Sequence, residues 1–145
     1  MAIMDARLEF SDAQVISASS ASAVLGTNVF DMSTKKNAWG TAITGDIGEG
    51  NNGLVVNFQV ATALNASAYV VAKVYHHTTS AVASGSVLGS VTFAAADTAG
   101  TRKNFRIPSG TVNRWVGVQY STVGSNMTTG AMDAWLGLDT ETPTK

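Results

Sequence analysis

Apolar and polar residues alternate along most of this chain, and the alternation predicts strands that each have one buried face. The pattern is clearest from Leu54 onward, where Gly, Ser, Asn and Thr fill the connections and Pro108 ends one strand. The strands expected in this part are Leu54–Ala61, Tyr69–His77, Ser86–Ala94, Thr101–Ile107, Val112–Tyr120 and Met132–Leu138.

The first part of the chain has a weaker pattern. Its short strand candidates, with a turn expected at Ser11 and Asp12, are Ala6–Phe10, Gln14–Ala18, Val24–Leu25 and Val29–Phe30. We expect residues 19–53 to form a long irregular segment laid over the sheets, and residues 140–145 to form a polar tail. About eight strands without a convincing helix predict an all-β fold. A single domain spanning residues 1–145, built as an antiparallel β-sandwich and favouring a jelly roll, fits this pattern.

The last two strands are predicted to pair as a hairpin, with their inward faces in the core. Trp115 and Trp135 then both lie on the outer faces. In the register that we prefer, Trp115 lies opposite Gly137 and Trp135 lies opposite Gly117. Because glycine has no side chain, each indole then covers the glycine on the neighbouring strand. In the alternative register, Trp115 lies opposite Trp135. Either another part of the chain covers the two indoles, or they form a surface for a partner.

Composition and charge exclude several classes of function. The net charge of −1 argues against a general nucleic-acid binder, which needs a broad basic face. The absence of cysteine rules out disulfides, thiol catalysis and cysteine metal sites. No apolar run approaches the ~20 residues of a membrane helix, and Met1–Asp12 does not resemble a secretory signal, so no membrane partner is expected.

No constellation of residues predicts catalysis. His76 and His77 are adjacent on a strand and must point to opposite faces, so they cannot chelate one ion together. The Gly-rich loop around Asp46 and Glu49 offers oxygen ligands, but their spacing does not match an EF-hand. No Gly-x-Ser-x-Gly elbow occurs, and a nucleophile–base pair cannot be assembled. We therefore expect no enzyme activity, no cofactor and no metal.

Basic and aromatic residues supply the candidates for partner contact. Arg102 and Arg106 share one strand face in a chain in which only 13% of residues are charged. Guanidinium groups form paired hydrogen bonds with carboxylates, which suits specific protein contacts. The alternative is an edge strand whose charges only prevent aggregation. The full candidate set is Lys35, Lys36, Trp39, Arg102, Arg106, Trp115 and Trp135.

A series of short motifs, in this order, resembles the jelly-roll cement (decoration) proteins of tailed bacteriophages. The resemblance spans nearly the whole chain, and its specificity comes from the order of the motifs. These motifs are Phe10–Gln14 (FSDAQ), Thr27–Asp31 (TNVFD), Asp46–Gly50 (DIGEG), Gly85–Ser90 (GSVLGS), Gln119–Val123 (QYSTV) and Thr129–Asp139 (TGAMDAWLGLD).

The resemblance implies a non-enzymatic protein on the outer surface of a virion. Such proteins bind shells of HK97-like major capsid protein and bridge neighbouring capsomers, often as homodimers. The family supplies no catalytic residues to transfer to this chain. An alternative from a different class is a carbohydrate- or receptor-binding jelly-roll module of a phage particle, in which Trp39, Trp115 and Trp135 stack on sugar rings.

Overall fold

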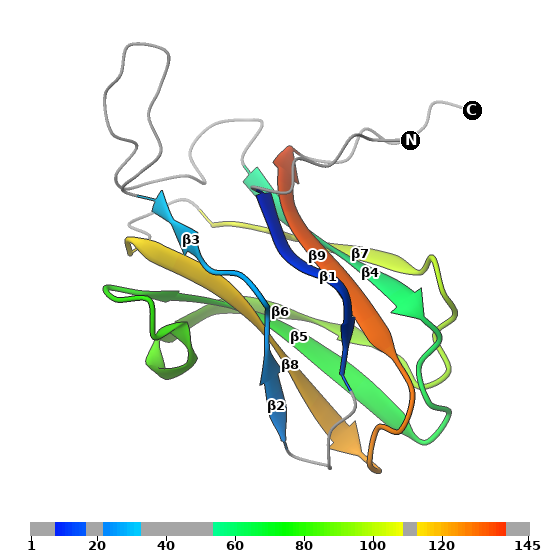
Figure 1. Cartoon of the computed structure of the whole chain (residues 1–145). Coiled ribbons are helices and arrows are strands. Elements are labelled where there is room, and N and C mark those ends of the chain that lie inside the picture. Colours follow the sequence, from blue (N-terminus) through cyan, green and yellow to red (C-terminus); the bar gives the residue numbers. More distant parts are fainter. Residues whose placement is uncertain (1–7, 17–21, 33–53, 109–112, 139–145) are drawn as a thin grey trace, which may run out of the picture.

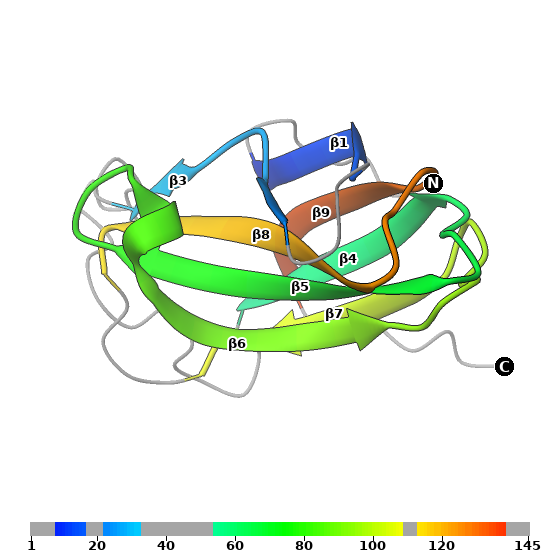
Figure 2. The same ribbon diagram turned by 90° about the horizontal axis from the view of Figure 1, so that it is seen from below.

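Two antiparallel sheets packed face to face make up the part of the chain that the structure describes (Figures 1 and 2). The structure is a computed structural model, and it describes residues 8–16, 22–32, 54–108 and 113–138. No helix among these residues is long and apolar enough to cross a bilayer. The elements are β1 (Glu9–Val15), β2 (Ala23–Leu25), β3 (Phe30–Asp31), β4 (Leu54–Thr62), β5 (Ala68–His77), the 3₁₀ turn η3 (Val82–Ser84), β6 (Ser86–Phe93), β7 (Arg102–Arg106), β8 (Trp115–Gly124) and β9 (Ala131–Leu138).

The strand order is that of a jelly roll. One sheet has the order β1-β9-β4-β7, and the other has the order β2-β8-β5-β6, with β3 also paired to β8. The pairs nest outward from β5 with β6, through β4 with β7, to β2 and β3 with β8 and finally β1 with β9. A long nested hairpin rolled into two sheets produces this order. The predicted all-β sandwich is therefore confirmed.

The core lies between the two sheets and is built from the inward residues of the alternating strands. In β5 the buried inward residues are Val70, Ala72 and Val74, while Tyr69 and Lys73 point outward, as the pattern predicts. β8 and β9 contribute their own alternate residues, which are Val116, Val118, Tyr120, Met132, Ala134 and Leu136.

The predicted hairpin of β8 and β9 is wrong, because the two strands belong to different sheets. β8 pairs with β5 over its whole length, and β9 pairs with β4. Trp115 therefore lies opposite His77, and Trp135 lies opposite Asn57. The inward faces of β8 and β9 meet across the core instead of lying side by side. Both registers considered for the hairpin are therefore wrong as well.

Three local predictions also need correction. The turn expected at Ser11 is absent, because β1 is one strand whose register against β9 shifts at two places. β4 is buried on both faces, since outward Val55 and Asn57 are buried as well as its inward residues. In β6, a register shift against β5 places Val87 opposite outward Tyr75, so Val87 is exposed instead of sharing the inward face.

Side chains tie the two sheets together at both open edges. At one edge, Lys103 of β7 donates to the Thr92 carbonyl of β6 over 2.5 Å. At the other, the Asn28 side chain donates to the Glu9 carbonyl over 3.0 Å. These bonds satisfy carbonyl groups that lie at the sheet edges.

Candidate partner-binding surfaces

The outer face of the β1-β9-β4-β7 sheet carries three of the predicted contact residues. Its rows follow from the register, because residues opposite each other point to the same side. One row contains Glu9, Trp135, Asn57 and Asn104, the next contains Asp133, Gln59 and Arg102, and a third contains Gly137, Val55 and Arg106. The structure therefore brings Arg102, Arg106 and Trp135 onto one surface.

Arg102 is held in place by two neighbours on this surface. Its Nε donates to Gln59 Oε1, and its guanidinium carbon lies 5.6 Å from the centre of the Trp135 ring. A guanidinium over an indole face gains cation–π attraction, and a fixed side chain loses less entropy on binding. Arg102 itself remains exposed. Its charge is therefore fixed in direction and still accessible.

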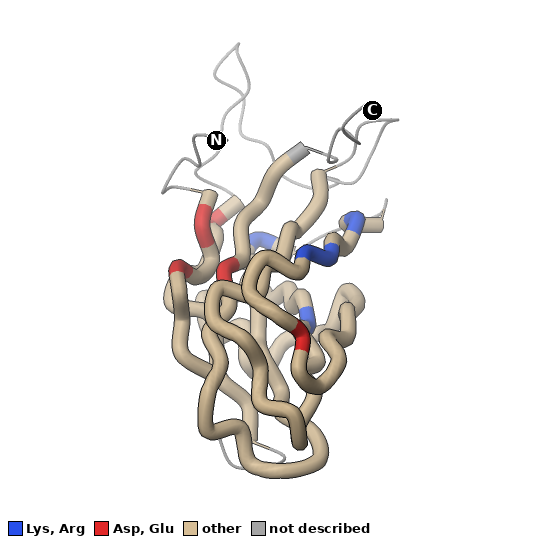
Figure 3. The backbone as a smooth tube through the Cα atoms, turned by 90° about the vertical axis from the view of Figure 1, so that its right-hand side faces the viewer, with Lys and Arg blue, Asp and Glu red and all other residues tan. Residues whose placement is uncertain are grey.

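Charges of opposite sign lie on opposite sides of this face (Figure 3). Glu9 and Asp12 lie on β1 and Asp133 on β9, whereas Arg102 and Arg106 lie on β7. Desolvation, followed by repulsion from Asp12 and Asp133, raises the pKa of Glu9. The face is therefore polar and divided, with an acidic side, a half-buried indole near the centre and a basic side.

Trp115 lies elsewhere, on the outer face of the other sheet. It is half-buried, and the Arg114 guanidinium carbon lies 5.3 Å from the centre of its ring. Arg114 also donates to both carboxylate oxygens of Asp31, each over 2.7 Å. The hydrogen bond that Arg114 donates to Asp31 is the main cause that raises the pKa of Arg114. Trp115 and Trp135 thus lie on opposite outer faces of the sandwich and cannot form one shared surface.

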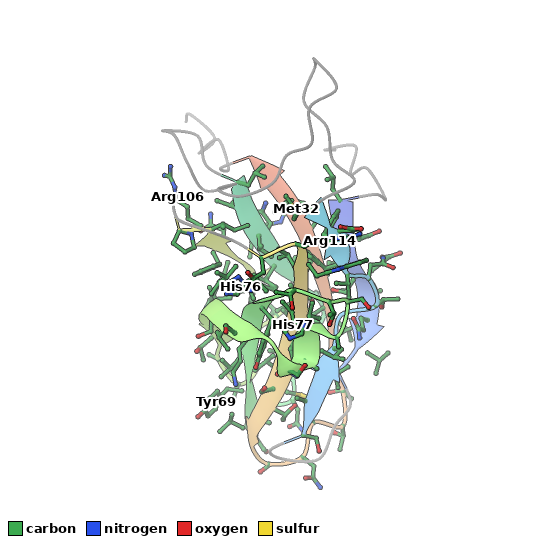
Figure 4. The ribbon with its side chains drawn as sticks, turned by 90° about the vertical axis from the view of Figure 1, so that its left-hand side faces the viewer. Met32, Tyr69, His76, His77, Arg106 and Arg114 are labelled. Atoms are coloured by element: carbon green, nitrogen blue, oxygen red, sulfur yellow. The ribbon has the colours of Figure 1, made fainter. Side chains whose placement is uncertain are left out.

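The rest of the β2-β8-β5-β6 outer face mixes exposed apolar residues with polar ones that are mostly neutral. Leu25, Tyr69 and Val87 on this face are 42%, 39% and 49% exposed. In the middle, the row across β2, β8, β5 and β6 contains Leu25, Gln119, Lys73 and Ser90. The neighbouring row contains Ala23, Ser121, Val71 and Thr92. Tyr69 and His77, at the two ends of the outward residues of β5, are labelled in Figure 4.

Near one end of β5, the outer face of the same sheet is covered by η3. Val82 of this turn is buried, and a Cβ on Gly117 would stand 2.7 Å from Val82 Cγ2. Tyr75 beside it is buried, and its hydroxyl donates to Gln119 Oε1 over 3.0 Å. This end of the face is therefore filled by the chain itself, while the middle is left open.

The histidines serve the local backbone. His76 Nδ1 accepts the Asn113 backbone N–H over 3.0 Å, and His77 Nδ1 accepts the Thr79 backbone N–H over 3.0 Å. His76 pairs with inward Val116 and His77 with outward Trp115, so the two rings face opposite sides, as expected. In the described ranges, no group of three or more His, Cys, Asp or Glu side chains is placed to hold a metal ion.

Three of the seven predicted contact residues, Lys35, Lys36 and Trp39, lie outside the described residues. Among the other four, only Arg102, Arg106 and Trp135 share a surface. The pair of Arg114 and Asp31 is a contact that the sequence did not predict.

Comparison with known proteins identifies a family. The model of the Bbp16 family, a bacteriophage-related family, matches residues 10–136, which run from β1 into β9. A search of curated proteins found no match.

Proposed function

The chain belongs to the Bbp16 family, and from this premise we propose that it is a capsid decoration (cement) protein. It binds the outer surface of a shell of HK97-like major capsid protein and stabilises the shell by bridging neighbouring capsomers. In this role it is a non-enzymatic virion protein, made in the host cytoplasm and added to the outside of the capsid as a homodimer. No nucleic acid, membrane, metal or cofactor takes part.

The arrangement of Arg102 over Trp135 is the observation that carries the proposal. Arginine and tryptophan dominate the binding energy of protein interfaces when they are well packed and lose water on binding. Here the guanidinium is held by Gln59 and by the indole, and it is exposed on the outer face of the sheet. Arg106 lies four residues along the same strand and points to the same side. A rigid face of this kind supports attachment to a protein surface.

A carbohydrate-binding role finds less support in the same geometry. Stacking on a sugar needs an open indole face. In Trp135 and Trp115, a guanidinium carbon lies 5.6 Å and 5.3 Å from the centre of the ring. Each indole therefore already has a cationic group over its ring.

Shell attachment is tested with undecorated shells assembled from the major capsid protein of the same phage. The double variant Arg102→Ala with Arg106→Ala is expected to bind at least about tenfold more weakly in co-sedimentation, the equivalent of ~1.4 kcal/mol. The variant Arg102→Lys with Arg106→Lys keeps the charges without the planar guanidinium groups and should bind with intermediate affinity.

The matched control is Arg114→Ala, which removes an exposed arginine at the Trp115 end of the other sheet, outside the open middle of that sheet's outer face. Thermal melting of each free variant separates loss of binding from loss of folding. Wild-type occupancy by the double alanine variant would contradict a contact role for this face. Binding to a glycan array without binding to shells would favour the carbohydrate alternative. Sedimentation velocity of the free protein tests the homodimer, and a monomer at all concentrations would count against it.

A further inference from the structure

Lys73 lies in the middle of the open part of the β2-β8-β5-β6 outer face. It points outward from β5, with Gln119 beside it on one strand and Ser90 on the other. Among the described residues, its ammonium group makes no hydrogen bond or ion pair. Lys73 is half-buried nevertheless, because its neighbours cover much of its side chain.

The surroundings of Lys73 are apolar or neutral. Val71 precedes it on the same face, Leu25 stands in its own row, and Tyr69 and Val87 are exposed farther along. The outward positions that pair across this open part carry no carboxylate in the described strands. The open part of the face therefore combines exposed apolar side chains and neutral polar ones with one positive charge, that of Lys73, at its centre.

This charge decides which kind of surface can cover the face. A second copy related by a two-fold axis through the centre would bring one Lys73 toward the other, with no acidic residue among the described outward residues of the open part to separate them. Asp31, at the Trp115 end of the same sheet, is already paired with Arg114. Two like charges that lose water together repel each other strongly. An apolar surface with one carboxylate would instead bury Leu25 and Tyr69 and pair with the ammonium group.

We propose that this face, with Lys73 at its centre, is a second docking site for the shell, and that its occupant is a patch of the major capsid protein in which apolar residues surround one carboxylate. The proposal rests on the proposed function and deepens it. Arg102 and Trp135 lie on one outer face of the sandwich, and Lys73 lies on the opposite one. A protein that bridges capsomers needs two such separate contacts, and simultaneous contacts strengthen attachment through avidity.

The first test uses Lys73→Glu, with Lys73→Arg as a control that keeps the charge. Lys73→Glu is expected to bind undecorated shells about 30-fold more weakly and to lose the protection of shells against heat, because a carboxylate would face a carboxylate. Lys73→Arg should bind and protect as the wild type does. Wild-type binding and protection by Lys73→Glu would overturn the proposal. A changed oligomeric state of free Lys73→Glu, with shell binding intact, would assign the face to a second copy and overturn it too.

A second measurement needs no variant of the face. Acetylation of lysines in the free and shell-bound wild-type protein, read by mass spectrometry, should show Lys73 modified about tenfold more slowly when bound, as expected for a group that loses water in an interface. Equal modification in the two states would overturn the proposal. If the wild-type protein does not bind shells at all, the proposed function itself fails, and this result is distinct from a failure at Lys73 alone.

Discussion

A buried hydrogen bond between the two sheets is expected to contribute measurably to stability. Ser11 of β1 and Tyr120 of β8 come from different sheets, and their hydroxyl oxygens lie 2.5 Å apart in the core. Ser11 is 0% exposed and Tyr120 is 1% exposed, so water cannot replace either partner. Tyr120→Phe removes the hydroxyl group alone, because the ring keeps its edge-to-face contact with Phe58.

The expected cost of Tyr120→Phe is ~1–3 kcal/mol, since the variant leaves a buried Ser11 hydroxyl without its partner. With a urea m value of about 1.5 kcal/mol/M, a loss of ~2 kcal/mol lowers the unfolding midpoint by roughly 1 M. Ser11→Ala should cost a similar amount for the same reason. The double variant removes both polar groups, so its cost should be clearly less than the sum of the two single costs.

The same residue gives the stability a pH dependence with a defined sign. Burial raises the pKa of Tyr120 above its ordinary value in the folded protein, while the hydrogen bond with Ser11 opposes the shift only in part. The unfolded chain releases this proton near pH ~10, but the folded chain retains it. The contribution of the protonated Tyr120 hydroxyl to the free energy of unfolding is therefore fully present below about pH 10, and it is lost as the pH rises beyond this value. Tyr120→Phe should lose less stability than the wild type between about pH 9 and 11.

Urea unfolding followed by tryptophan fluorescence, at several pH values, measures both effects. An unchanged midpoint for Tyr120→Phe would refute the reasoning about the buried bond. Strict additivity of the two single variants would show that the hydroxyl groups do not interact. If the free energy of unfolding fell equally steeply with rising alkaline pH in the wild type and in Tyr120→Phe, the pH dependence could not be assigned to this hydroxyl.

Two further predictions concern other contacts. Gly117→Ala places a methyl group 2.7 Å from Val82 Cγ2 and should cost ~1–3 kcal/mol in urea unfolding. The same change should cost less in a Val82→Ala background, and equal costs in both would show that this contact does not decide the choice of glycine. Glu9→Gln should stabilise the protein at pH 7, because it relieves desolvation and the repulsion from Asp12 and Asp133 that raise the pKa of Glu9. The gain should vanish below about pH 4, where the unfolded glutamate is protonated, and a gain that persists at pH 3 would contradict this cause.

Residue alternation alone predicted where most strands lie and which side chains face the core. This works because successive side chains of a strand point to opposite sides, which is a local property of the backbone. Val70, Ala72 and Val74 of β5 were assigned inward in this way, and the exposed position of Arg102 and Arg106 on β7 followed from the same rule. The motif order predicted a phage protein, in agreement with the Bbp16 match.

Strand pairing was decided by the tertiary structure. Alternation says which face of a strand is apolar, but two strands with apolar faces can pair side by side or pack across a core. β8 and β9 take the second arrangement, and for this reason Trp115 and Trp135 lie on opposite outer faces. Val82 likewise covers Gly117 from a distant part of the sequence. The burial of outward Val55 also cannot be read from the alternation of its own strand. Local periodicity therefore determined the strands and the facing of their side chains, whereas only the packing of the two sheets decided which of those side chains share a surface.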